Sequence, residues 1–138
     1  MSTPNLLLVN PIDIHHVWHE AKPLIDKALK HSEGELLSSD VLKLIFEGKQ
    51  ALWIGINKKK LFCAGITEII TYPQKKVLRI ITFSTKPGYH YDLWKDFIYT
   101  LEDYGKHFKC SAIEAWARKG LARKLKWDHE YSVITKNI

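Results

Sequence analysis

Cysteine is scarce in this chain, and long apolar segments are missing from it. The two cysteines, Cys63 and Cys110, lie far apart and form no Cys-x-x-Cys pair, so the sequence predicts buried free thiols rather than a disulfide scaffold. No apolar run approaches the roughly 20 residues that a membrane-spanning helix needs. The first residues lack the basic and apolar regions of a signal peptide. We therefore expect a soluble, cytoplasmic protein without a membrane partner.

Repeats, linkers and low-complexity segments are also missing, so we expect a single domain over residues 1–138. Apolar material is plentiful: 46% of the residues are hydrophobic and 12% are aromatic, which is enough for one buried core. The net charge is +6, from 21 basic and 15 acidic residues. This excess favours acidic partners without requiring one.

The stretch from Val77 to Phe108 organises the rest of the chain. Residues 77–83 are β-branched and apolar, as expected of a buried central strand, and residues 84–88 have turn chemistry. From Asp92 onward, apolar residues recur every three or four positions, which predicts an amphipathic helix. A strand that leads into a helix through a short loop places backbone N–H groups at the helix start, where anions bind readily.

The remaining elements follow from the same periodicity and turn chemistry. Pro23 lies inside the first predicted helix and should kink or split it, and Ser38, Ser39 and Asp40 should cap the second, which ends at Gly48. The element order is β-α-α-β-β-β-α-β-α-β. It predicts an α/β (α+β) fold with a mixed, mainly antiparallel sheet and helices on both faces. The predicted strands cover 6–9, 50–57, 61–72, 77–83, 111–116 and 130–136, and the predicted helices cover 11–30, 38–47, 92–108 and 118–126.

Several short stretches, in their order and spacing, carry a resemblance to a known family. They are Trp18 with 21–24, residues 48–53, Thr67-Glu68 with Tyr72-Pro73, Trp94, and residues 117–125. With them the chain resembles the GNAT superfamily of N-acetyltransferases over nearly its whole length, and within it the short GNAT-like proteins of tailed bacteriophages. The resemblance implies a GNAT-like fold, acetyl-coenzyme A as cofactor, and transfer of an acetyl group to an amine.

The resemblance also implies where the cofactor binds. In the family, backbone amides between the fourth strand and the next helix hold the pyrophosphate, and the pantetheine arm lies where the fourth and fifth strands part. The family loop is Arg/Gln-x-x-Gly-x-Gly/Ala, whereas residues 85–90 here contain one glycine. The implied cofactor contacts are Ile81, Thr82, Phe83, Thr85, Lys86, Gly88, Tyr89 and His90, and Arg118 and Arg123 would approach the coenzyme phosphates.

Catalytic residues are implied less directly. GNAT enzymes often use a tyrosine near the last helix as general acid and a glutamate or a water on the central strands as base. Predicted helix 118–126 contains no tyrosine, and strand 77–83 contains no carboxylate. The catalytic candidates are therefore Glu68, Glu114 and Tyr131, with either glutamate relaying a proton from the incoming ammonium. The alternative for each glutamate is a strand-end position or an ion pair with a nearby Arg or Lys.

The single glycine in the loop and the missing tyrosine leave a second function open. It is a catalytically inactive GNAT-fold protein that serves as a virion component, or that binds a host protein or nucleic acid. Nucleic acid would contact the basic helix 118–126 and the aromatic residues beside it. His15 and His19 lie one helical turn apart, but no third metal ligand is evident, so we predict a solvated helix face and no metal site.

Overall fold

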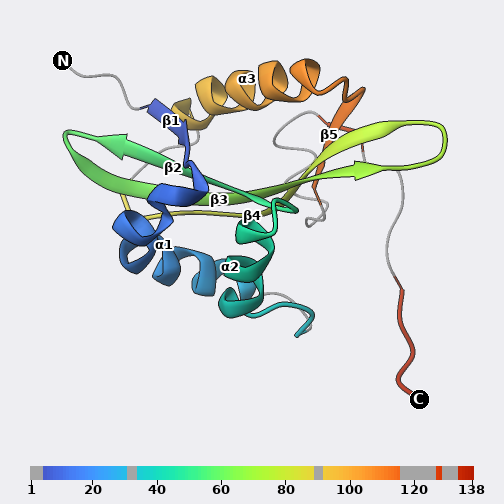
Figure 1. The fold of residues 1–138 in the computed structure, drawn as a ribbon, viewed down its shortest axis with the longest axis horizontal. Coiled ribbons are helices and arrows are strands. Elements are labelled where there is room, and N and C mark those ends of the chain that lie inside the picture. Colours follow the sequence, from blue (N-terminus) through green and yellow to red (C-terminus); the bar gives the residue numbers. More distant parts are fainter. Residues whose placement is uncertain (1–4, 31–33, 89–91, 116–126, 129–133) are drawn as a thin grey trace.

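The computed structural model describes residues 5–30, 34–88, 92–115, 127–128 and 134–138. Figure 1 shows three layers, with a five-stranded sheet between helices. α1 (Ile14–Leu29) and α2 (Ser38–Phe46) cover one face of the sheet, and α3 (Asp92–His107) covers the other. A short 3-10 helix, η1 (Pro11–Asp13), leads into α1. The predicted α+β class with helices on both faces is confirmed.

The sheet is mixed, as the sequence predicts. Its spatial order is β1-β2-β3-β4-β5, so the strands follow one another along the sheet as they do along the chain. The first three pairings are antiparallel and the β4–β5 pairing is parallel, because α3 carries the chain back across one face before β5 begins. The strands are β1 (Asn5–Leu8), β2 (Ala51–Asn57), β3 (Lys60–Thr71), β4 (Lys76–Thr85) and β5 (Ala112–Ala115).

A tight turn joins β2 and β3 between the strands predicted over 50–57 and 61–72. Lys58 and Lys59 both have positive φ, of 52° and 64°, as the two central residues of a type I′ hairpin turn require. Between β3 and β4, the Tyr72 N–H donates to the Lys75 carbonyl over 2.7 Å and closes the second hairpin. The two hairpins fix the register of the three central strands.

The helix ends partly correct the sequence analysis. Leu37, not Ser38 or Asp40, is the N-cap of α2, and Asp40 lies in its first turn, where Oδ2 accepts from the Leu37 N–H over 2.9 Å. At the other end Gly48, with φ of 76°, closes a Schellman motif as predicted, since the Gly48 and Lys49 N–H groups donate to the Ile45 and Leu44 carbonyls. α1 continues through Pro23 without being split, because this proline is exposed and the hydrogen bond that it removes lies on the solvent side.

Two clusters of buried side chains lie on the two faces of the sheet. One joins α1 and α2 to the sheet and includes Ile14, Ile25, Val41, Ile45, Leu52 and Ile66. The other joins α3 to the opposite face and includes Trp53, Phe62, Leu78, Phe97 and Leu101. Both cysteines are free thiols, Cys63 buried as predicted and Cys110 half-buried. Trp18 is half-buried against the first cluster.

The predicted C-terminal elements lie mostly outside the described residues. This holds for the basic helix 118–126 and for residues 130–133 of the last predicted strand. Residues 134–138 are described and have no regular secondary structure, so the strand does not extend over 134–136. None of the helices in the described part of the chain combines the length and apolar composition that a bilayer crossing requires.

Candidate functional site

A cleft of about 730 Å³ lies where β2 begins beside the longer strand β3. The β2–β3 pairing starts at Ala51, which faces Thr67. Beyond that pair β3 continues to Thr71 alongside β4 alone, so Glu68 is the first residue of β3 that β2 no longer covers. The ends of β1 and α2 and one side of α3 complete the walls. The lining residues are Leu8, Val9, Asn10, Pro11, Ile45, Gly48, Lys49, Gln50, Ala51, Thr67, Glu68, Ile69 and Tyr104.

Glu68 and Gln50 form the polar centre of this cleft. The Gln50 side-chain Nε2 donates to Glu68 Oε1 over 3.0 Å, and within the described part of the chain no cation forms an ion pair with Glu68. Gln50 itself is 7% exposed, and its Oε1 is buried without a hydrogen-bond partner among the described residues. A buried acceptor without a hydrogen-bond partner lowers the stability of the fold by about 1–3 kcal/mol. The Gln50 side chain therefore holds the Glu68 carboxylate at a cost in stability.

Glu114, the second catalytic candidate, has a different environment. Glu68, Arg79 and Glu114 face one another across β3, β4 and β5, so their side chains lie in one row on one face of the sheet. Arg79 donates from Nε to Glu114 Oε1 over 2.7 Å, and its Nη2 lies 2.6 Å from the same oxygen and 2.9 Å from the Tyr72 hydroxyl. Glu114 does not line the cleft. Its arrangement matches the ion-pair alternative, whereas Glu68 faces open space.

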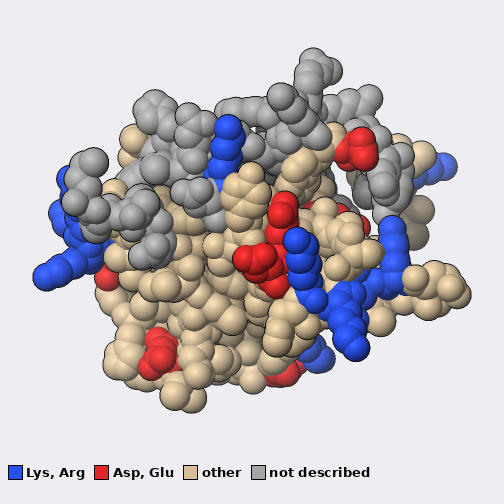
Figure 2. Space-filling view, turned by 90° about the horizontal axis from the view of Figure 1, so that it is seen from above, with Lys and Arg blue, Asp and Glu red and all other residues tan. Residues whose placement is uncertain are grey.

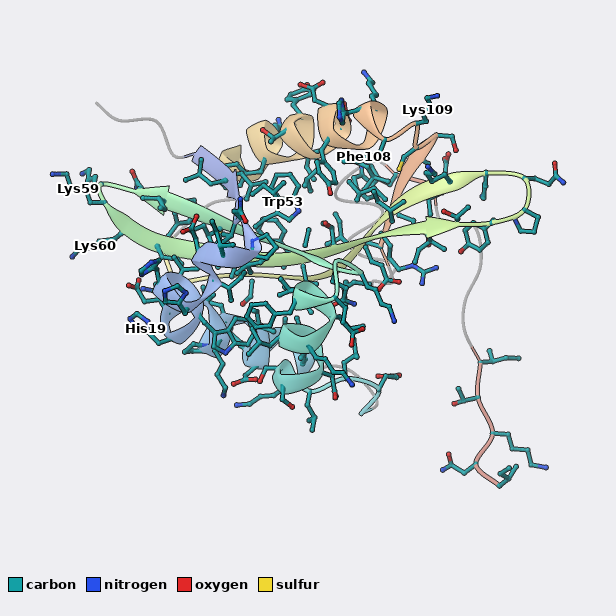
Figure 3. All side chains as sticks on the ribbon, in the orientation of Figure 1. His19, Trp53, Lys59, Lys60, Phe108 and Lys109 are labelled. Carbon is teal, nitrogen blue, oxygen red and sulfur yellow. The ribbon has the colours of Figure 1, made fainter. Side chains whose placement is uncertain are left out.

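The cleft also has an aromatic wall on the α3 side. Figure 3 shows Trp53 between the sheet and α3, where its Nε1 donates to Thr67 Oγ1 over 2.9 Å. The Tyr104 ring stands edge-on to Trp53 with centroids 5.0 Å apart. Burial, with a smaller contribution from the nearby Cys110, raises the pKa of Tyr104. The Tyr104 hydroxyl is thus protonated at neutral pH and can donate a hydrogen bond.

Two of these cleft residues were not recognised from the sequence. Gln50 was the first residue of a predicted strand, and Tyr104 was one of the apolar positions of the long helix. What makes them part of a site is the register that places Ala51 opposite Thr67, together with the packing of α3. No local motif encodes either fact.

The predicted cofactor residues lie at the other end of β4. The β4–β5 pairing ends at Ile80 and Ala115, while β4 itself runs on to Thr85. The β3–β4 register shifts at this point, because Ile66 faces Thr82 while Thr67 faces Ile80, which leaves Ile81 as the extra residue of a β-bulge. Over the described residues, β4 therefore has a bulge beside the point where its pairing with β5 stops.

Backbone geometry provides a donor on the side of β4 that the described part of β5 does not cover beyond Ile80. The Lys86 N–H donates to the Phe62 carbonyl over 2.7 Å, so the backbone N–H of residue 86 points toward β3. Because N–H groups alternate in direction along a strand, the Thr85 N–H points away from β3, toward the side on which the described part of β5 has ended. A ligand lying along β4 beyond Ile80 would meet this donor.

The side chains of this region vary in exposure. Ile81, Phe83 and Thr85 are half-buried, and Lys86 and Gly88 are exposed. Thr82 is buried, and its Oγ1 has no hydrogen-bond partner among the described residues. Gly88 has a φ of 96°, which only glycine adopts readily. Tyr89, His90, Arg118, Arg123 and Tyr131, the other predicted site residues, lie outside the described residues.

A second lysine joins Lys86 near this loop. Lys27 extends from α1, and its Nζ lies 3.4 Å from the Thr85 carbonyl oxygen. Two cationic side chains from different elements thus lie at the start of the loop that leads to α3. Sequence reasoning missed Lys27, because nothing in the helical pattern of residues 11–30 indicates what its polar face approaches.

The other sequence-derived surface features lie on solvated faces. His15, His16 and His19 are exposed on α1, as predicted, and His19 Nε2 lies 3.8 Å from Glu20 Oε1. Within the described ranges, no three potential metal ligands come together. On the face shown in Figure 2, Lys and Arg side chains are spread out and several lie beside Asp or Glu. The described part of this face therefore has no continuous basic stripe.

Comparisons with known proteins identify the fold. No protein-family profile matches the chain, and no curated protein matches it in sequence. Among solved structures, a GNAT-family acetyltransferase of Staphylococcus aureus is 16% identical, with a TM-score of 0.72 over 99% of this chain and 100% of that one. The aminoglycoside N-acetyltransferase AAC(6′)-Iy in complex with coenzyme A is 13% identical, with a TM-score of 0.74 over 100% and 96%. A ribosomal-protein-alanine N-acetyltransferase of Brucella melitensis is 12% identical, with a TM-score of 0.72 over 97% and 99%.

These likenesses show that the chain has the GNAT acetyltransferase fold. The fold is thus established over nearly the whole chain, as the sequence resemblance implied. At such low identities it does not carry an activity with it. The features that bear on function are the cleft and the stretch of β4 beyond Ile80, where its pairing with the described part of β5 ends.

Proposed function

We propose that this protein is an N-acetyltransferase that uses acetyl-coenzyme A to acetylate an amine. The observation that carries the proposal is the position of Glu68. Its carboxylate lies in an open cleft and forms no ion pair among the described residues. Its cross-strand neighbour Arg79, two residues from the bulge at Ile81, contacts Glu114. A carboxylate in that position can bind an ammonium group close to a place where a strand ladder parts.

The residues along β4 fit the cofactor. Beyond Ile80 the strand has an outward-facing backbone donor and a buried Thr82 hydroxyl without a partner among the described residues. Lys27 and Lys86 are suited to the negative charge of the coenzyme phosphates. When bound, acetyl-coenzyme A supplies the acetyl group as a reactive thioester. We propose cofactor contacts at Ile81, Thr82, Phe83, Thr85, Lys86 and Gly88, and add Lys27 to them.

The chain's own residues then have defined tasks. Glu68 attracts the substrate ammonium and accepts its proton, directly or through one water, which leaves the nitrogen able to react. A positioned proton acceptor contributes about 10²–10⁴-fold to a rate. The Gln50 amide keeps the carboxylate turned toward the cleft. Backbone amides around the bulge are donors of the kind that polarise a carbonyl oxygen.

Thermal unfolding with and without acetyl-coenzyme A tests cofactor binding. A ligand at a hundredfold its dissociation constant stabilises a protein by about 2.7 kcal/mol, and release of free coenzyme A thiol in the presence of amines reports turnover. We expect both signals, and we expect Lys27→Ala with Lys86→Ala to weaken the first. The absence of any shift at millimolar cofactor would contradict the proposal.

That result would instead favour the alternative raised by the sequence. An inactive GNAT-fold protein, serving in a virion or binding a host protein or nucleic acid, predicts neither stabilisation nor thiol release. Retention on DNA or heparin with a steep salt dependence would then identify the nucleic-acid version. A phage origin and a cytoplasmic location stay predictions from the sequence.

A further inference from the structure

We infer that the cleft at the start of β2 selects an amine that has a single cationic group on a compact apolar body. This inference rests on the proposed acetyl transfer, and it specifies which acceptors the site takes. It is carried by the charges that line the cleft, by the nature of its walls and by the hydrogen bond between Gln50 and Glu68.

The cleft has one place for a cation. Among the described residues that line it, Glu68 is the only acidic side chain. The other charged residue is Lys49, which is exposed and lies 3.2 Å from Glu47 Oε2. A second ammonium on the ligand would find no other carboxylate among the described lining residues, and Glu47, just outside them, is already paired with Lys49. A polycationic amine is therefore disfavoured over a monoamine.

The remaining walls are mostly apolar. Val9, just after β1, and Ile45 on α2 belong to the cluster on the α1–α2 face, the face on which Gln50 and Glu68 also lie. Ile69 and the Tyr104 ring line the cleft from the opposite face of the sheet. A volume of about 730 Å³ lies in the range of small-molecule sites. A compact alkyl body can thus pack against Val9 and Ile45 while its ammonium meets Glu68.

Gln50 fixes where the cation binds. Its amide N–H holds Glu68 Oε1, while its own carbonyl oxygen is buried without a partner among the described residues. Because this arrangement costs stability, an apolar side chain of similar length should be tolerated by the fold. The same change frees the Glu68 side chain and should weaken binding of the ammonium.

A matched pair of ligands tests the inference on the intact protein. Hexylamine and 1,6-diaminohexane have the same six-carbon body and differ in the second amine. We expect isothermal titration calorimetry to show hexylamine binding at least about tenfold more tightly. Tighter or equal binding of the diamine would overturn the inference, as would the absence of hexylamine binding at millimolar concentration.

Variants locate the binding in the cleft. Glu68→Gln should weaken hexylamine binding about tenfold or more, whereas Glu20→Gln, with the same change of charge on an exposed part of α1, should leave it unchanged. Gln50→Met should weaken binding on the order of fivefold without lowering the melting temperature. Unchanged affinity in Glu68→Gln, or a Gln50→Met variant that is unstable yet binds normally, would contradict the assignment.

Binding and turnover separate this inference from the proposed function. If hexylamine binds in the expected way but is never acetylated, the cleft assignment holds and the acetyltransferase proposal fails. If diamines or larger polycations are acetylated with a higher kcat/KM than hexylamine, the protein is an acetyltransferase and the inference about its acceptor is wrong.

Discussion

Two glutamates on either side of Arg79 show how neighbours decide the role of a side chain. Glu68 on β3 and Glu114 on β5 lie in the same row of the sheet, one strand away from the same guanidinium. Arg79 contacts Glu114 and the Tyr72 hydroxyl, and Glu68 receives a neutral amide N–H from Gln50 instead. One carboxylate is thereby paired with a cation within the sheet, whereas the other forms no ion pair among the described residues.

The largest expected difference between Glu68 and Glu114 is in the rate of acetyl transfer. Glu68→Gln should lower kcat for acetyl transfer by about 10²–10⁴-fold, because the proton acceptor is lost while size and shape are kept. Glu114→Gln should lower it at most a few-fold, since that side chain does not line the cleft. Steady-state rates with a monoamine acceptor measure both, and an equal loss in the two variants would remove the distinction.

The next largest effect should be on stability in the Glu114 region. Arg79→Met leaves a half-buried carboxylate without its cation, and we expect the free energy of unfolding to fall by about 2 kcal/mol, between the values for buried and exposed ion pairs. Urea denaturation measures the loss. The double variant Arg79→Met/Glu114→Gln should recover part of it, because the unpaired charge is removed as well. A double variant no more stable than Arg79→Met would show that packing, not charge, dominates.

Alkaline pH should destabilise the fold independently of either carboxylate. Burial raises the pKa of the Cys63 thiol from 9.0 to about 12, so the folded state keeps a proton that the unfolded chain releases. The stabilisation is complete below pH 9 and is lost as the pH rises from 9 toward 12. We expect a loss of about 1 kcal/mol between pH 9 and pH 10.

Chemical denaturation at pH 8, 9 and 10 measures this loss, with Cys63→Ala as the control. The difference between the two proteins isolates the Cys63 thiol from every other group, because all the others are present in both. Parallel pH dependences would show that Cys63 is not responsible. The two glutamates are therefore best compared at neutral pH.

The smallest expected change in the free energy of unfolding comes from Tyr72→Phe. This change removes the hydroxyl that accepts from Arg79 Nη2 over 2.9 Å and leaves the contact with Glu114 in place. The cost should be under about 1 kcal/mol, since water can replace a hydroxyl at this half-buried position. A loss as large as that of Arg79→Met would mean that Tyr72, rather than Glu114, anchors the arginine.

The sequence predicted the elements better than it predicted the relations between them. Strands and helices followed from periodicity, and the helix end at Gly48 from local chemistry, because these signals act over a few residues. Glu68 and Glu114 could not be told apart, since only the strand register shows which of them faces the cleft. The cap at Leu37 was missed for a related reason, because the Asp40 side chain reaches back to a residue of a type that rarely caps a helix.

The hydrogen bonds at the end of α2 link the size of the cleft to the position of Glu68, the proposed base. The Leu44 carbonyl accepts from the N–H groups of both Lys49 and Gln50. These bonds fix the backbone of Gln50, the residue before β2, to the last turn of α2. Ile45, on that turn, lines the same cleft as Gln50. Enlarging the pocket at Ile45 for a bulkier amine would therefore also shift the amide that orients Glu68. An engineer who redesigns acceptor choice here has to adjust substrate room and proton transfer together.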